Sequence, residues 1–282
     1  MILSREAKPD FPWWLVATVL IAAVSGFAIL SSDLYSQVFR TVSRGLGITV
    51  LVTLIGFASA CLIGLGVALM ALSSSLWLRQ TARFYVEIVR GVPILVLLFW
   101  IAFAGVPAFV AGWNAVMTPL RDAGLVGELL VRDVSLLARA VIALTIGYSA
   151  FIAEVFRAGI QSVEAGQIEA AKALGLSRFQ RFRLVVMPQA LRTILPPLGN
   201  DFVAMVKDSS LVSVLGVADI TQMAKVYAAG SFRFFETYSI VAYIYLVLTV
   251  GLSIALRALE KRMREGRPVA GAPLSESRSP HD

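Results

Sequence analysis

Residues 45–78, GLGITVLVTLIGFASACLIGLGVALMALSSSLWL, carry no charged side chain between Arg44 and Arg79. An α-helix rises about 1.5 Å per residue, so about 20 apolar residues cross the ~30 Å hydrocarbon layer of a bilayer. The stretch is longer than one crossing needs, and it lacks the alternation of polar and apolar residues that a membrane β-barrel strand requires. It therefore predicts a transmembrane helix over about 46–72.

Other apolar stretches repeat this pattern along the chain. Helices are predicted at 13–31, 92–110 and 238–256, where no residue is charged. Two further spans are predicted at 139–160 and 193–218, which do contain charges. The composition agrees, because 58% of the residues are hydrophobic and 15% are charged, against about 45–50% and about 25% in an average soluble domain. We therefore expect an all-α integral membrane protein and exclude a disordered chain.

The distribution of basic residues predicts the orientation. With 158–195 placed in the cytoplasm, most Lys and Arg residues fall on the cytoplasmic side of six helices, and both chain termini lie there too. The net charge of +7 is therefore assigned to membrane topology rather than to nucleic-acid binding. A cleaved signal peptide is an alternative for 13–31, but it lacks a clear A-x-A site, and Trp13 and Trp14 are typical of interfacial anchors.

The sequence offers no candidate for catalysis, a metal or a cofactor. Cys61 is the single cysteine, which excludes an internal disulfide, and His281 is the single histidine. Neither Cys/His ligand spacing nor a Ser/His/Asp constellation is present. The chain also lacks the G-x-x-x-x-G-K-[ST] phosphate loop, so ATP binding of the P-loop kind is not expected.

The long cytoplasmic segment 158–195 is the most informative part of the sequence. A first short helix is predicted over about 164–174, ending at Gly175, a residue typical of helix C-termini. A second is predicted to begin at Ser177, because Gln180 follows three residues later in a capping-box pattern. Pro188 is predicted to end this second helix.

The second short helix has an apolar stripe at Phe179, Phe182 and Val186, and arginines surround it. Such a stripe must be covered. The sequence leaves two possibilities open: the bilayer surface and a groove on a partner protein.

The segment resembles the EAA loop of ABC-transporter permeases, EAA-x3-G-x9-I-x-L-P. The matching residues are Glu169-Ala170-Ala171, Gly175 and Val185-Val186-Met187-Pro188, with Val for Ile and Met for Leu. The neighbouring segments resemble the polar amino acid permease family, of the histidine/glutamine/arginine type; they read AFIAEVFRAGIQSVEAG and MPQALRTILPPLGNDFVAMVKDSSLVSVLGV. The likeness covers about 44–257.

This resemblance implies a type I ABC importer transmembrane domain, with a five-helix core plus one extra N-terminal helix. The implied regions are a cytoplasmic segment and extra helix over 1–43, a permease domain over 44–257 with its EAA loop at 163–190, and a cytoplasmic tail over 258–282 that is predicted to be disordered. The implied ATPase-coupling residues are Glu169, Ala170, Ala171, Gly175 and Pro188.

The resemblance also implies the partners. The permease would pair with a second permease chain, identical or different, in the inner membrane. Its EAA loop would dock on a cytosolic ABC ATPase subunit dimer, and an extracytoplasmic amino-acid-binding protein would deliver the substrate. Membrane lipid would surround the helices, and the transport step would be alternating access.

Charged side chains within two of the expected helices suggest a substrate pathway. Asp201 and Asp208 are seven residues apart and share one helical face, while Lys207 lies off that face. A charge at the bilayer centre costs about 2.5–3.5 kcal/mol on insertion scales, so these charges need a role. One hypothesis is that they and Glu154 contact the substrate. The alternatives are helix–helix pairing, access to cytoplasmic water, and an ion pair between Glu154 and Arg157.

Two other classes of protein remain as alternatives. An ion-driven secondary transporter also fits intramembrane Asp and Lys residues, but it has no use for the two capped helices in 158–195, and no inverted repeat is visible. An intramembrane enzyme or a membrane scaffold is the third class.

Overall fold

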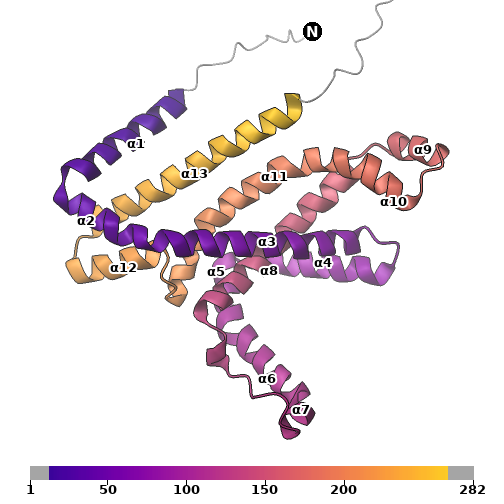
Figure 1. Cartoon of the computed structure of the whole chain (residues 1–282), viewed down its shortest axis with the longest axis horizontal. Coiled ribbons are helices and arrows are strands. Elements are labelled where there is room, and N and C mark those ends of the chain that lie inside the picture. The colour runs from indigo at the N-terminus through magenta and orange to yellow at the C-terminus, as the bar shows by residue number, and fades with distance from the viewer. Residues whose placement is uncertain (1–12, 266–282) are drawn as a thin grey trace, which may run out of the picture.

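A computed structural model describes residues 13–265 of the chain. Every regular element in that range is a helix, and the helices form an elongated, branched bundle (Figure 1). Residues 1–12 and 266–282 lie outside the described range, and with them the expected cytoplasmic N-terminal segment, most of the expected disordered tail and both chain termini. The expected all-α class is confirmed.

The long apolar helices lie over the charge-free stretches of the sequence, and further helices lie between them. Their bounds are α1 Trp13–Ser31, α2 Asp33–Val42, α3 Leu46–Ala71, α4 Leu76–Gly91, α5 Ile94–Trp100, α6 Val106–Val116, α7 Thr118–Asp122, α8 Leu136–Gln161, α9 Ala165–Ala173, α10 Arg178–Arg181, α11 Met187–Asp208, α12 Ile220–Ser231 and α13 Phe234–Glu265. Short 3-10 helices cover Ser43–Gly45 (η1), Val131–Asp133 (η3) and Ser209–Leu215 (η5), and π-turns cover Ile101–Gly105 (η2) and Phe182–Val186 (η4).

Five helices of the described range are long and apolar enough to cross a membrane: Trp13–Ser31, Asp33–Ala71, Ile94–Val116, Leu136–Gln161 and Phe234–Arg262. They correspond to five of the six predicted spans. The sixth, 193–218, is not among them. Its helix α11 starts earlier, contains Pro196 and Pro197, and gives way to a 3-10 helix after Asp208. At the other end, α13 continues past 257 into the segment predicted as tail.

The main core lies where α3 crosses α8. A side chain at Gly64 would place its Cβ 2.9 Å from Ile152 Cγ2 and from the carbonyl oxygen of Ser149, so only glycine permits this approach. Leu144 and Leu98 are fully buried in the same cluster, together with Val52 of α3. Close packing through small residues is typical of helices in membranes.

A second cluster joins the expected extra helix to the rest of the chain. Ile29 near the end of α1 packs with Val38 and Val42 of α2, and these contact Ile220 of α12 and Ile240 of α13. The remainder of α1 is almost entirely exposed. Figure 1 places α2 and α12 at one end of the molecule and α9 and α10 at the opposite end, with α3 running between them.

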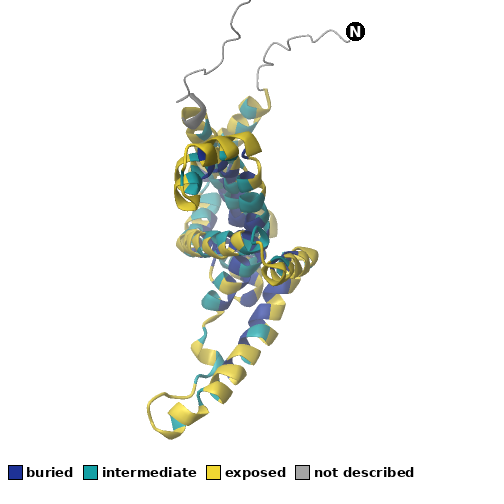
Figure 2. Ribbon diagram, turned by 90° about the vertical axis from the view of Figure 1, so that its right-hand side faces the viewer, coloured by how far each residue is buried: buried dark blue, intermediate teal, exposed yellow. Residues whose placement is uncertain are grey.

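The segment from α6 to η3 projects away from the bundle, and most of it is exposed (Figures 1 and 2). Hydrogen bonds fix its shape. The Asn114 side chain donates to the carbonyl oxygen of Leu129 at 2.7 Å and accepts from its N–H at 3.0 Å. At its base the buried guanidinium of Arg139 donates to the carbonyl oxygens of Ala102, Val131 and Val134.

Candidate functional site

The loop that carries the EAA motif forms the short helices α9 and α10, joined by a tight turn. Gly175 adopts a left-handed conformation with φ of 76°. Its N–H donates to the carbonyl oxygen of Lys172 at 3.0 Å, and the N–H of Leu176 donates to that of Ala171 at 3.2 Å. This pair of bonds is the Schellman motif. The predicted helix end at Gly175 is confirmed.

The start of the second short helix is also confirmed. The Ser177 hydroxyl accepts from the N–H of Gln180 at 3.3 Å, and the Gln180 side chain accepts from the N–H of Ser177 at 2.8 Å. These reciprocal bonds form the predicted capping box. The turn between the helices is therefore set on both sides by local sequence.

Apolar contacts anchor the loop to the bundle. Val163, Val186, Ala190 and Ile194 are buried together, and Ile168 and Phe182 pack against them with residues of α8. This cluster joins α9 and η4 to α8 and α11. α9 and η4 are therefore held against two long helices.

The predicted stripe of Phe179, Phe182 and Val186 does not form one exposed face. Phe182 and Val186 pack inward in the anchoring cluster, whereas 69% of Phe179 is exposed. Phe179 and Phe182 are joined by regular α-helical bonding. The π-turn η4, in which the N–H of Met187 donates to the carbonyl oxygen of Phe182, five residues earlier, shifts the helical register only for the residues after Phe182.

Pro188 does not end a helix, so that prediction is wrong. The chain stays helical from Arg178 through η4 to Asp208, and Pro188 lies in the first turn of α11. A proline has no N–H to donate, which the first turn of a helix tolerates. With regular α-helical hydrogen bonding, a proline at position 188 would be expected to end the helix.

The outer face of the loop combines the motif residues with large apolar side chains. Glu169, Ala170 and Gly175 are exposed, while Ala171 is buried. Leu174 and Phe179, on either side of the turn, are 80% and 69% exposed, and Leu184 is 61% exposed. These three side chains form the exposed apolar face of the loop.

A polar cavity of about 400 Å³ lies between the end of α3, α4 and α8. Glu154 and Arg157 line it from α8, and Arg83, Glu87 and Arg90 line it from α4. Side chains of both signs therefore face one space. Such a wall is suited to a small zwitterion, which presents a carboxylate and an ammonium group.

Within this cavity Glu154 and Arg157 form the ion pair that their spacing allowed. Arg157 Nη2 lies 2.6 Å from Glu154 Oε2, and Arg157 Nε lies 3.1 Å from the same oxygen. Arg157 Nη1 also donates to Gln161 at 2.6 Å. On the α4 side, the Arg90 guanidinium carbon lies 5.3 Å from the ring centroid of Phe151.

Three charged residues in the C-terminal half of α11, Asp201, Lys207 and Asp208, do not line that cavity. Asp208 accepts a hydrogen bond from the Tyr148 hydroxyl at 2.8 Å. The Oδ2 atom of Asp201 is buried without a hydrogen-bond partner in the described part of the chain. Lys207 is exposed. The expected candidates thus occupy two places, with Glu154 in one and Asp201 and Asp208 in the other.

Sequence reasoning missed the contribution of α4. Arg83, Glu87 and Arg90 are spaced four and three residues apart, so they share one helical face. The topology prediction used Arg83 and Arg90 only as basic residues of the cytoplasmic side, and it gave Glu87 no role. Their spacing was a usable signal, but the pairing of α4 with α8 was not visible in the sequence.

Comparisons with known proteins agree with this architecture. Residues 60–265 match the family described as binding-protein-dependent transport system inner membrane component. The glutamine transport system permease protein GlnP of Escherichia coli (strain K12) is 37% identical over 222 residues, which cover 78% of this chain and 92% of that protein. The probable amino-acid permease protein YxeN of Bacillus subtilis (strain 168) is 34% identical over 225 residues, which cover 80% and 92%.

Solved structures share the fold. A crystal structure of an amino acid ABC transporter with histidines has a TM-score of 0.67 and 37% identity, and the match covers 83% of this chain and 98% of that chain. An inward-facing MetNI methionine ABC transporter matches with a TM-score of 0.62, covering 82% and 99%, and at 20% identity it supports the fold alone. The resemblance to ABC-transporter permeases, first suggested by the EAA motif, is confirmed. The chain belongs to the family of binding-protein-dependent transport system inner membrane components.

Proposed function

We propose that this chain is the permease subunit of an ATP-driven importer for polar amino acids, and that its EAA loop couples it to a separate ATPase subunit. The observation that carries the coupling is the exposed apolar face of Leu174, Phe179 and Leu184 around a turn that Gly175 and Ser177 hold in place. An apolar helical face of this kind fits a hydrophobic groove on a partner.

The loop is also built to transmit a force. Glu169, Ala170, Ala171 and Gly175 lie in α9 and its turn, and Pro188 lies where the loop becomes α11. The anchoring cluster ties this unit to α8, which carries Glu154, and to α11, which carries Asp201. ATP-driven closure of the ATPase dimer would draw two such loops together and open the pathway to the outside, and hydrolysis would reverse the movement.

The substrate class follows from the relatives and from the polar cavity. The similar proteins include a glutamine permease and amino-acid permeases. In the cavity, Arg83 and Arg90 could attract the carboxylate of an amino acid, and Glu87 and Glu154 its ammonium group. Asp201, Lys207 and Asp208 would act on the same pathway from α11, although each could instead stabilise helix packing.

The remaining parts follow the same scheme. A second permease chain, identical or different, would complete the pathway, and an extracytoplasmic binding protein would deliver the amino acid. The end of the molecule that carries α2 and α12 would face outside, since α9 and α10 would face the cytoplasm. Residues 44–257 would form the permease domain, preceded by the extra helix of 1–43 and followed by the cytoplasmic segment 258–282.

Cysteine cross-linking tests the coupling surface. In a Cys61→Ser background, single cysteines at Leu174 or Phe179 are expected to cross-link to the co-expressed ATPase subunit. A cysteine at Leu120, exposed on the projecting segment, is the matched control and is expected to give no such product. Equal cross-linking from all three positions, or none from Leu174 and Phe179, would contradict the proposal.

Substitution of Glu154 and Asp201 tests the pathway. Glu154→Gln is expected to reduce uptake, or change substrate choice, at unchanged membrane abundance. If both transport and substrate choice stay as in the wild type, Glu154 does not contact the substrate. For Asp201→Ala, a fall in abundance together with uptake would assign that residue to helix packing rather than to transport.

A further inference from the structure

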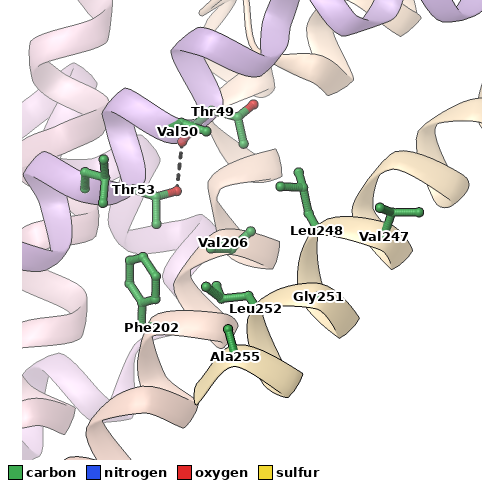
Figure 3. Close-up of a pocket in the computed structure, with 11 residues that line it drawn as sticks. Thr49, Val50, Thr53, Phe202, Val206, Val247, Leu248, Gly251, Leu252 and Ala255 are labelled. Atoms are coloured by element: carbon green, nitrogen blue, oxygen red, sulfur yellow. Dashed lines mark hydrogen bonds between the residues drawn. The ribbon is translucent and has the colours of Figure 1, made fainter. Parts of the chain in front are cut away.

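An apolar groove runs between α3, α11 and α13, on a side of the bundle that the transport scheme does not use (Figure 3). Its volume is about 480 Å³, and its walls include Phe202 and Val206 of α11 and Leu248 and Leu252 of α13. The only side-chain hydroxyls in the wall belong to Thr49 and Thr53.

Both hydroxyl groups already donate a hydrogen bond within α3 and its first turn. Thr49 donates to the carbonyl oxygen of Gly45 at 3.2 Å, and Thr53 donates to that of Thr49 at 2.8 Å, the bond drawn in Figure 3. A polar amino acid or a row of water molecules would find almost no hydrogen-bond partner here, and polar groups without partners are costly to bury. The groove therefore suits an apolar occupant.

A second cavity of about 180 Å³, largely apolar, lies farther along α13; it shares Phe202 with the groove and reaches Leu256, Leu259 and Glu260. From residue 247 to residue 260, α13 rises about 20 Å. One leaflet of a bilayer contributes about 15 Å of hydrocarbon, half of the ~30 Å layer. The combined groove is therefore long enough to hold one extended acyl chain.

The groove lies on another face of α11 from its half-buried carboxylates. Phe202 and Val206 point into the groove, Asp201 and Asp208 are not part of its wall, and Asp208 is bonded to Tyr148 of α8. An occupant of the groove would contact α11 without meeting those charges.

Charge at the end of the groove indicates which lipid would fit. Glu260 lines the end of the second cavity, and the exposed Arg262, three residues after Leu259, follows the same face of α13 beyond that cavity. Lys261 is two residues after Leu259 and lies on another face. Basic residues at the membrane surface attract anionic headgroups.

We propose that this groove binds one acyl chain of an anionic phospholipid, with the headgroup phosphate at Arg262. The lipid comes from the leaflet that meets the C-terminal end of α13. Its tail fills an irregular space whose lining side chains would otherwise lack contacts on one side, and its phosphate supplies the charge that selects it. The proposal is independent of the substrate and of the ATPase partner.

Photolabelling tests whether the acyl chain lies in the groove. The full-length chain is placed in nanodiscs with phosphatidylglycerol that carries a diazirine within its acyl chain, and labelled peptides are mapped. Gly251 lines the groove, and a side chain there meets nothing within 4 Å, so Gly251→Phe blocks the space. Gly66, also open on α3 but outside the groove, gives the control Gly66→Phe. Ala255→Phe provides a second block, and thermal unfolding checks that each variant is folded.

We expect label on peptides that contain Phe202 and Leu252 in the wild type and in Gly66→Phe, and its loss in the two blocked variants. Groove peptides without label in the wild type, or labelled equally in folded Gly251→Phe, would overturn the proposal. A second copy of the chain in the groove would also overturn it. That arrangement would produce disulfide-linked dimers from Leu252→Cys in the Cys61→Ser background.

Native mass spectrometry tests the headgroup through competition between phosphatidylglycerol and phosphatidylcholine. Arg262→Gln is expected to lower the preference for phosphatidylglycerol by about fivefold, the effect of one basic residue at a membrane surface. Lys261→Gln, on the other face, is expected to change it much less. An equal loss of this preference in both variants, or no loss in Arg262→Gln, would show that Arg262 does not bind the headgroup phosphate.

Discussion

Replacement of Gly175 by alanine tests the shape of the coupling loop. At φ of 76°, Gly175 occupies the left-handed region, which costs an L-residue about 1–2 kcal/mol. A Cβ there would meet nothing within 4 Å, so the penalty is conformational and not steric. An alanine that leaves this region breaks the two Schellman bonds from Gly175 and Leu176. If the partner binds only the native turn, its affinity should fall about 5- to 30-fold, the factor that 1–2 kcal/mol represents.

The assay is the dissociation constant of the purified permease for its ATPase subunit. Gly175→Asn should fall between wild type and Gly175→Ala, because asparagine tolerates the left-handed region better. Gly166→Ala is the matched control. Gly166 is exposed within α9 with open space around it, and alanine there favours the helix. Wild-type affinity in Gly175→Ala, or an equal loss in Gly166→Ala, would refute the reasoning.

Three other predictions concern stability, each measured as thermal unfolding of the purified chain. Gly64→Ala should lower the free energy of unfolding by about 1–3 kcal/mol, because the added methyl group overpacks against Ile152. Gly66→Ala should have almost no effect, since a Cβ there has no neighbour within 4 Å. Equal effects of the two substitutions would contradict the close crossing of α3 and α8. Arg139→Lys should lower the free energy of unfolding by about 3 kcal/mol, because an ammonium group cannot reach the three carbonyl oxygens that the guanidinium binds. An unchanged melting temperature would refute this prediction. Burial raises the pKa of Asp219 above its usual 3.8, and this effect outweighs the lowering by the hydrogen bonds from Thr221 and Gln222. The wild type should therefore lose stability relative to Asp219→Asn as the pH rises from 3.8 toward the raised pKa. A stability difference that does not change with pH would contradict this cause.

Local sequence was sufficient to predict much of the fold. The predicted span 13–31 and α1 end at the same residue, Ser31, shortly before Asp33 ends the charge-free stretch. The turn at Gly175 and the capping box at Ser177 were also predictable, since each involves residues close in sequence. These features need no knowledge of the tertiary packing.

Features that depend on tertiary contacts were not predictable in this way. Phe182 packs in the anchoring cluster while Phe179 stays exposed, so the stripe through these residues was misassigned. The π-turn η4 leads directly into α11, so the chain stays helical at Pro188, which was taken as a helix end. Only the packing of α4 against α8 brings Arg90 to the cavity that contains Glu154. The burial of Asp201 Oδ2 and the bond from Tyr148 to Asp208 also depend on long-range packing.

The most direct test of the account is uptake by the chain reconstituted in liposomes, with and without its ATPase subunit and binding protein. We predict that amino acid accumulates only when all components and ATP are present, and that Gly175→Ala lowers uptake in proportion to its weaker ATPase binding. Accumulation by the chain alone, driven by an ion gradient, would show that α9 and α10 do not serve a separate ATPase, and would contradict the account.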